Sequence, residues 1–435
     1  MISRHFLIAG ALVCASLVAC GGSTNPCEGV TGTCTEFAAG TSESTISNAI
    51  SGAKDGTTFA FDEGTFTFTN EISIANKNIT IKGSGQDATI LDFGAQAAGA
   101  EGILAQDGSD GIAFTALTVR DPAGNGVKVV GSTGVKFTNM KVVWTNQDKT
   151  KHGAYGVYPV QSKQVLIDGV TVEGAADAAI YVGQSDGIVV RNSTARLSVA
   201  GIEIENSFNA DVYNNTSTLN AGGILVFDLP GLQQKGGHNV RVYNNKIINN
   251  TTTNFGAAGS TVSLVPTGTG VLVMANHDVE VFGNTISGNG TTGVAVVSFL
   301  VTQISYSDAT YNPFPSKVHI HDNVVADPAS PNGTNPDIGR QLGLLLYAHK
   351  SDFPGGHVPE MLYDGIVDGT TTSSFPNNSM SICFKNNTAS TATFANLHFD
   401  QCNTNCANLG TIITTDITPN ACSLDALPAV TFPGL

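Results

Sequence analysis

Two glutamates separated by one residue, Glu203 and Glu205, are the residues whose types and spacing most suggest chemistry. They lie in the segment "AGIEIENS", where Ile202 and Ile204 alternate with them. Alternate residues of a strand point to the same face, so both carboxylates would leave that face about 7 Å apart. This separation suits a general acid and a general base that act through a water molecule. We predict both as catalytic residues on an exposed sheet face; the alternative is a solvated pair of surface residues.

Neighbouring segments repeat this pattern and add side chains to the same face. The segments "YGVYPV", "AAIYVG", "AGIEIE" and "GGILVF" align without gaps. Tyrosine rings can stack on sugars, and side-chain amides can bond to hydroxyl groups. We therefore predict a ligand-binding patch that contains Tyr158, Gln161, Tyr181, Gln184, Asn206, Phe227 and Asp228. Two loop-like insertions, 229–239 and 251–268, are expected to wall a groove over this patch.

No cofactor is predicted. Clustered carboxylates at Glu203, Glu205 and Asp228 make calcium the alternative, although no calcium-binding repeat occurs in the sequence. His319 and His321 alternate along one segment, as metal ligands can, but the sequence offers no evident third ligand. No metal site is therefore predicted.

The patch belongs to a repeating unit of the chain. The small residues Ala179, Gly201 and Gly223 each precede an Ile, at intervals of 22 residues, and similar intervals recur from residue 100 onward. A period of this length that contains only strands and turns is typical of one coil of a parallel β-helix. One coil cannot bury its apolar side alone, so coils stack until a continuous core exists.

A second strand in each repeat ends at an Asn or Gly. The matching positions are Asn139, Asn192, Asn214 and Asn244, with Gly169, Gly283 and Asp322 as substitutes. Asn and Gly tolerate left-handed turns. Stacked amides can also bond to one another in a ladder. These asparagines are therefore interpreted as structural.

The fold class predicted is all-β: a single-stranded, right-handed parallel β-helix. Its right-handed path follows from the chirality of parallel connections. A short amphipathic helix at 44–54 would cap the first coil. We expect the β-helix to span residues 41–382 and a cysteine-rich cap to span 383–435.

The N-terminal segment indicates export. Residues 1–19 have a short apolar run after Arg4, and "LVAC" at 17–20 resembles the lipobox of bacterial lipoproteins. That resemblance implies removal of the signal peptide, lipidation of Cys20, and a tether at 20–40 that holds the protein at the cell envelope. Gly21 after this cysteine implies the outer membrane. The alternative is a secreted protein cleaved near Ala19.

An exported compartment permits disulfides. Cys27 and Cys34 are close enough in sequence to pair. The other four cysteines can pair in three ways: Cys383, Cys402, Cys406 and Cys422. The net charge of −15 excludes nucleic acid as an expected partner, because phosphate contacts need clusters of Lys and Arg.

The segments "GAYGVYPVQS", "DAAIYVGQS", "AGIEIENS" and "GGILVFDLPG" resemble those of bacterial parallel β-helix repeat lipoproteins, in the pectin-lyase-like superfamily. The superfamily includes pectate lyases, polygalacturonases and uronate epimerases. Their Gly-His-Gly and Asp-Pro-His-Asp signatures are missing from this sequence. The resemblance implies an exported protein that binds a polysaccharide and, if it is an enzyme, acts on it as a lyase, epimerase or hydrolase. The alternative is a non-catalytic envelope scaffold that binds a partner protein.

Overall fold

The computed structural model describes residues 25–326 and, with short gaps, 346–432. The predicted signal peptide and the predicted lipidation at Cys20 therefore lie outside the described residues. Within the described part, no helix is both long and apolar enough to cross a membrane.

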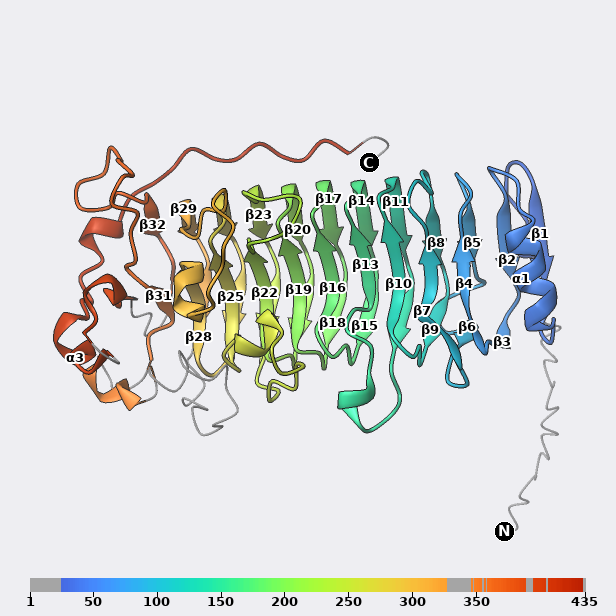
Figure 1. The fold of residues 1–435 in the computed structure, drawn as a ribbon, viewed down its shortest axis with the longest axis horizontal. Helices are drawn as coiled ribbons and strands as arrows, with labels where there is room; N and C mark the ends of the chain where they lie inside the picture. The colour runs from blue at the N-terminus through green and yellow to red at the C-terminus, as the bar shows by residue number, and fades with distance from the viewer. Residues whose placement is uncertain are drawn as a thin grey trace, which may run out of the picture.

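In the part of the chain that the structure describes, the strands form three parallel sheets, which we call A, B and C (Figure 1). Sheet A contains β1 (Cys34–Phe37), β2 (Thr58–Phe61), β5 (Thr80–Lys82), β8 (Ala113–Thr115), β11 (Thr133–Thr138), β14 (Lys163–Asp168), β17 (Asp186–Arg191), β20 (Phe208–Tyr213), β23 (His238–Tyr243), β26 (His277–Phe282), β29 (Ser316–His321) and β32 (Ile382–Lys385). Sheet B contains β3 (Gly64–Thr67), β6 (Thr89–Asp92), β9 (Thr118–Arg120), β12 (Lys141–Val143), β15 (Thr171–Glu173), β18 (Thr194–Arg196), β21 (Thr216–Thr218), β24 (Lys246–Ile248), β27 (Thr285–Ser287) and β30 (Val324–Ala326). Sheet C contains β4 (Asn70–Ile74), β7 (Ala98–Ala105), β10 (Asn125–Val130), β13 (Val157–Val160), β16 (Ala178–Gly183), β19 (Ala200–Glu205), β22 (Gly222–Phe227), β25 (Thr269–Met274), β28 (Thr292–Val297), β31 (Met361–Tyr363) and β33 (Phe394–Asn396).

From β2 to β31, each coil contributes one strand to each sheet and pairs with the neighbouring coils. Ile180, Ile202 and Ile224 are paired in this way across β16, β19 and β22, and all three are fully buried. Their side chains point into the solenoid, where they form a continuous apolar core. The predicted parallel β-helix is confirmed. The long interval after Gly223 is one coil with two insertions, because β22 pairs directly with β25.

The predicted capping helix is confirmed as α1 (Glu43–Ser51). The Ser42 hydroxyl accepts the backbone N–H of Thr45 at 3.2 Å and so caps the helix. Ile46 and Ile50 lie one turn apart and are buried against the first coils. The short helix α3 (Leu409–Ile412) lies at the opposite end of the stack (Figure 1).

The disulfides resolve the alternatives that the sequence left open. Cys27 pairs with Cys34, as predicted. The later cysteines form the pairs Cys383–Cys422 and Cys402–Cys406. After Cys422 the chain runs back along sheet A as an extended tail (Figure 1). The tail is held by hydrogen bonds from the Leu427 and Val430 backbone to carboxylates on β26 and β20.

The asparagine ladder exists, but the sequence assigned it to the wrong residues. Asn192, Asn214 and Asn244 have φ of 51–55° and are the left-handed turn residues. These three side chains are exposed, and the ladder is formed by the buried residue that follows each left-handed turn. Its members are Ser193, Asn215, Asn245, Asn284, Asn323 and Asn387, each bonded to the next. The turn and the ladder thus need two adjacent polar residues.

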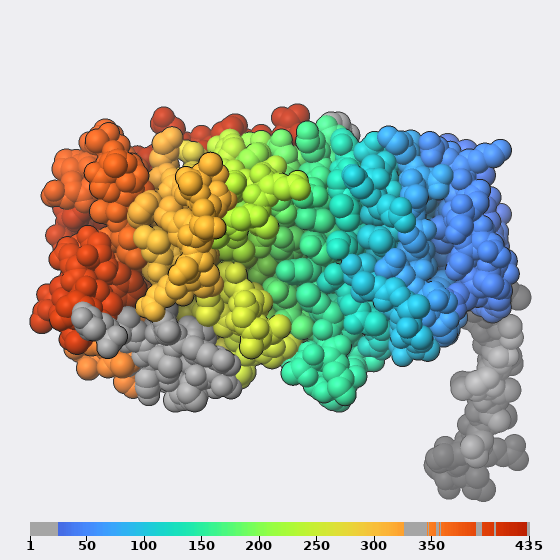
Figure 2. All heavy atoms as spheres, viewed as in Figure 1, coloured from blue at the N-terminus to red at the C-terminus, as the bar shows by residue number. Residues whose placement is uncertain are grey.

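Insertions cover much of the outer face of sheet C. Val262 and Val265, from the loop between β24 and β25, pack in one apolar cluster with Leu225 on β22. Phe299 and Tyr311, from the segment between β28 and β29, belong to the same cluster. Figure 2 shows the yellow and orange insertions built up over the C-terminal half of the stack. The predicted patch therefore lies where an open sheet face meets a covered one.

Candidate functional site

The columns predicted on the outer face of sheet C are present. Tyr181 on β16 is paired with Glu203 on β19, and Glu203 is paired with Leu225 on β22. The alternation sends the intervening isoleucines inward, as predicted. Glu203 and Glu205 are two positions apart on β19, so their side chains lie on the same face of sheet C.

The prediction that this face is exposed was wrong, because the insertions bury most of it. Tyr158 and Gln184 are half-buried, and Gln161 is exposed. The other predicted site residues have exposed fractions of 8% or less: Tyr181, Glu203, Glu205, Asn206, Phe227 and Asp228. The catalytic and binding roles of these residues stay predictions.

Three tyrosines pack together at the boundary between the open and the covered face. The ring centroid of Tyr155 lies 4.6 Å from that of Tyr158 and 4.5 Å from that of Tyr181. Tyr158 and Tyr181 are 4.9 Å apart, edge to face. Tyr155 was not among the predicted residues because it precedes β13 and falls outside the aligned strands. With the adjacent acids, these side chains form the acid–tyrosine cluster: Tyr155, Tyr158, Asp177, Tyr181, Glu203 and Glu205.

Gly183 makes room for one contact of this cluster. The Tyr181 hydroxyl donates a hydrogen bond to Glu205 Oε1 at 2.8 Å. A Cβ atom at Gly183 would overlap the Tyr181 ring. The space that glycine leaves beside Glu205 is thus filled by tyrosine, so it is not free for a ligand.

Some carboxyl oxygens of the cluster lack hydrogen-bond partners within the described part of the chain. Among the described residues, Asp177 Oδ1 and Glu203 Oε1 are buried without a hydrogen-bond partner. Burial, reinforced by the neighbouring Glu205 charge, raises the pKa of Asp177 to about 7. Burial raises the pKa of Glu205 to about 7 and that of Glu203 well above its usual range. The cluster can therefore hold protons near neutral pH.

Asn206 and Asp228 organise the loop that follows β22. The Asn206 carbonyl oxygen accepts the Leu229 N–H, and its amide donates to the carbonyl groups of Leu229 and Gln234. The Asp228 carboxylate accepts the backbone N–H groups of Gly236 and Gly237. Both side chains are thus engaged within the protein, and they fix the loop that carries Gln233 and Gln234.

Gln161 and Gln184 line an open groove at the turn from sheet C to sheet A. We call this the amide groove; its volume is about 680 Å³. It is lined by Asp107, Gly131, Gln161, Ser162, Lys163, Gln184, Asp186, Phe208, Gln233, Gln234 and Lys235. Only two of the predicted residues are among them. The rest were missed because they lie in sheet A, in the turns that lead to it or in the insertion, and the prediction aligned sheet C alone.

Hydrogen bonds between side chains and loop backbone shape the groove. Gln184 Oε1 accepts the backbone N–H of Gln233 at 3.1 Å, and the Gln161 amide lies 3.3 Å from Gln233 Oε1. Lys235 is paired with Asp308 at 2.8 Å. Among the described residues, Lys163 has no carboxylate within salt-bridge distance, so its ammonium group is available to a ligand.

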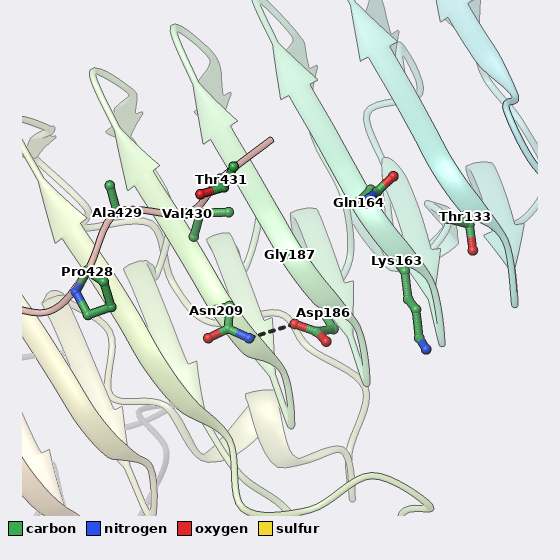
Figure 3. Close-up of a pocket in the computed structure, with 10 residues that line it drawn as sticks. All are labelled: Thr133, Lys163, Gln164, Asp186, Gly187, Asn209, Pro428, Ala429, Val430 and Thr431. Atoms are coloured by element: carbon green, nitrogen blue, oxygen red, sulfur yellow. Dashed lines mark hydrogen bonds between the residues drawn. The ribbon is translucent and has the colours of Figure 1, made fainter. Parts of the chain in front are cut away.

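A second hollow of about 410 Å³ continues from the amide groove toward the C-terminal tail. The two hollows share Lys163 and Asp186. Figure 3 shows that Asp186 is bonded to Asn209 and that the tail crosses the strands beside them. This hollow is lined by Thr133, Lys163, Gln164, Asp186, Gly187, Asn209, Pro428, Ala429, Val430 and Thr431.

Solved structures with a similar fold include the A-module of a mannuronan C-5 epimerase from Azotobacter vinelandii. It is 15% identical, with 80% of this chain and 88% of that chain covered and a TM-score of 0.43. An endo-xylogalacturonan hydrolase from Aspergillus tubingensis is 14% identical, with coverages of 69% and 96% and a TM-score of 0.37. An alginate lyase from Paenibacillus sp. is 11% identical, with coverages of 83% and 96% and a TM-score of 0.37. A comparison with curated proteins found no significant match. The family described as right handed beta helix region matches residues 77–231 and 134–305, which together make up more than half of the chain, and the protein therefore belongs to the right-handed β-helix family.

Proposed function

We propose that this protein binds an extended polysaccharide in the amide groove. One observation carries the proposal: consecutive coils present polar side chains there in register. Gln161 and Gln184 occupy the same turn position in successive coils, each with φ near 50°. In sheet A, Lys163 on β14 lies opposite Asp186 on β17 in the strand register, and Asp186 lies opposite Phe208 on β20.

The regular spacing of the coils favours a polymer as the ligand. Neighbouring parallel strands lie about 4.8 Å apart, so equivalent groups recur at that interval along the groove. An extended chain of sugars also presents equivalent hydroxyl groups at regular intervals. Side-chain amides both donate and accept hydrogen bonds and so match hydroxyl groups. The half-buried Phe208 ring adds an apolar surface for a sugar face.

Lys163 supports an acidic polysaccharide over a neutral one. Lys163 lines both hollows, and the carboxylate of a uronate would supply the counter-charge for its ammonium group. The protein as a whole carries a net charge of −15, which repels a polyanion. Salt screens this repulsion as well as the contact with Lys163, so we expect a modest dependence of affinity on ionic strength.

Binding without turnover is the function that the geometry supports best. Acid–base catalysis needs the carboxyl group within hydrogen-bond reach of the sugar. Glu203 is 1% exposed and Glu205 is 8% exposed, so the tyrosines and insertions separate them from the groove. Their predicted catalytic role would require these tyrosines and insertions to move away from the carboxyl groups.

Removal of groove side chains is expected to weaken binding. Gln161→Ala and Lys163→Ala should each reduce the affinity for a uronate polysaccharide about tenfold, because each deletes one polar or charged contact. Affinity can be measured by isothermal titration calorimetry against a panel of uronate and neutral polysaccharides. Gln147→Ala is the matched control, because Gln147 is an exposed glutamine outside the groove.

Glu203→Gln separates binding from catalysis in the same panel. It should retain binding, since Glu203 does not line the groove. Unsaturated or reducing ends that form with the wild type and vanish in Glu203→Gln would instead make the protein an enzyme. Equal affinity of the wild type and both groove variants would contradict the proposal, as would a stable complex with a partner protein and no binding to any polysaccharide.

We also propose that lipid on Cys20 anchors the protein to the cell envelope, on the basis of the lipobox-like "LVAC" segment. The full-length protein is then expected to partition into the detergent phase of a cell extract, and Cys20→Ala into the aqueous phase. Recovery of the wild type in the aqueous phase would contradict the anchor.

A further inference from the structure

A second cluster of ionisable side chains lies on the outer face of sheet A, far along the stack from the amide groove. Glu280 on β26 is paired with His319 on β29, and His319 is paired with Cys383 on β32. His321 lies two residues further along β29, on the same face as His319. Because Val318 and Ile320 fill the core, both imidazoles point outward.

The three side chains bring their ligand atoms together. One carboxylate oxygen of Glu280 and one ring nitrogen from each histidine all lie within 4.8 Å of one another. His321 Nε2 is 3.0 Å from Glu280 Oε1. Two ligand atoms each about 2.1 Å from an ion, at angles of about 90–110°, are themselves about 3.0–3.4 Å apart. The observed separation is thus compatible with two ligands of one ion.

His319 is the observation that points to a ligand. Its side chain is 93% buried, and neither ring nitrogen has a hydrogen-bond partner among the residues that the structure describes. Buried polar groups in native proteins are nearly always paired, and each exception needs an explanation. The ring lies 4.0 Å from the His321 ring, so its nitrogens are held beside the other two ligands.

Neighbouring groups already orient the other two ligands. His321 Nδ1 is 2.8 Å from Asp322 Oδ2, which fixes this nitrogen as a donor and leaves Nε2 for an ion. The Phe282 ring stacks on His321 at 5.3 Å. Glu280 Oε2 accepts the Leu427 N–H of the C-terminal tail at 3.1 Å, which leaves Oε1 toward His321. This arrangement resembles the outer shell of protein metal sites.

We propose that Glu280, His319 and His321 bind one divalent transition-metal ion of the zinc type. Imidazole nitrogens with one carboxylate suit zinc, copper or nickel, whereas calcium and magnesium prefer all-oxygen ligands. The site could not be predicted from the sequence because the third ligand, Glu280, lies on the preceding coil. The 18-residue segment between β28 and β29 breaks the repeat there, so the alignment of Glu280 with His319 emerges only from the strand pairing.

Isothermal titration calorimetry with ZnCl₂ on the purified protein tests the site. The wild type should bind one Zn²⁺ tightly and show no comparable binding of Ca²⁺ or Mg²⁺. His319→Gln should weaken Zn²⁺ binding more than about 100-fold, since outer-shell partners alone are worth about 10–100-fold. His277→Gln is the matched control: His277 lies on β26, three residues before Glu280, and its Nδ1 is bonded to Ser316.

A second variant keeps the test decisive if His319→Gln fails to fold. Asp322 has φ of 51°, a conformation that Asn also tolerates, so Asp322→Asn should fold and weaken Zn²⁺ binding about tenfold. Absorbance of the Co²⁺-loaded protein should likewise change in Asp322→Asn and not in His277→Gln. Failure of the wild type to bind Zn²⁺, or equal binding by all variants, would overturn the proposal.

Discussion

Raising the pH from 5 to 8 is expected to lower the free energy of unfolding by at least about 2 kcal/mol. Burial raises the pKa of Asp177, Glu205 and Asp364 to about 7 in the folded protein, whereas carboxyl groups in an unfolded chain titrate near 4. Between these values the folded state holds protons that the unfolded state has released. Stability is therefore highest below pH 4 for these groups and falls as the pH rises toward 7.

The decrease in the free energy of unfolding depends on how many groups release a proton between pH 5 and pH 8 and on how far their pKa values are shifted. One pKa unit corresponds to about 1.4 kcal/mol, and several groups contribute in the same window. Carboxylates whose pKa is lowered, such as Asp308 beside Lys235, titrate below this pH window. Burial lowers the pKa of His319 to about 4, so this group acts in the opposite direction within the window and offsets part of the fall. Urea unfolding at pH 5 and pH 8 measures the difference.

The double variant Asp177→Asn with Glu203→Gln tests the origin of this dependence. Neutral amides imitate the protonated carboxyl groups, so the variant should lose part of the pH dependence and resemble the wild type more closely at pH 5 than at pH 8. Asp148→Asn, an exposed carboxylate in the loop before β13, is the control and should leave the dependence unchanged. An identical pH dependence in the double variant and the wild type would exclude Asp177 and Glu203 as its cause.

Replacement of one ladder asparagine is expected to lower the free energy of unfolding strongly. Asn245 Oδ1 accepts both the backbone N–H and the side-chain amide of Asn215. Its own amide donates to the Val212 carbonyl and to Asn284 Oδ1. Asn245→Ala leaves the Asn215 backbone N–H without its partner and removes one hydrogen bond each from the Asn215 amide, the Val212 carbonyl and Asn284 Oδ1, so we expect a loss of roughly 3 kcal/mol.

The adjacent residue provides the control for this substitution. Asn244 is exposed and has φ of 54°, a conformation that glycine adopts freely. Asn244→Gly should therefore change the free energy of unfolding by less than about 1 kcal/mol. Urea unfolding of the two variants at one pH compares them. Equal losses would mean that the ladder adds no more stability than the turn.

The periodic part of this protein could be predicted from its sequence. Alternation fixes which side of a strand a residue occupies, so Tyr181 and Glu203 were placed correctly in one column. The ladder was assigned one residue too early because the turn and the ladder both favour asparagine, as at Asn214 and Asn215. Only the backbone conformation tells the two positions apart.

The burial of the predicted site could not be read from the sequence. Val262 and Val265 cover the sheet from an insertion that has no repeat of its own, so no pattern relates them to the strands beneath. The amide groove was missed in part for the same reason: Gln233 and Lys235 reach it from another insertion. Periodicity therefore located the strands but not the loops that decide which side chains a ligand can reach.

Hydrogen–deuterium exchange with and without a uronate oligosaccharide tests whether the ligand binds in the amide groove. If the ligand binds there, backbone amides at 161–163, 184–186 and 231–236 should exchange more slowly in its presence, and those at 144–153 should not change. Lys163→Ala should need about tenfold more oligosaccharide to give the same protection. Binding in the amide groove would be contradicted if the oligosaccharide is bound and exchange in the three groove segments is unchanged. Protection confined to other coils would contradict it as well.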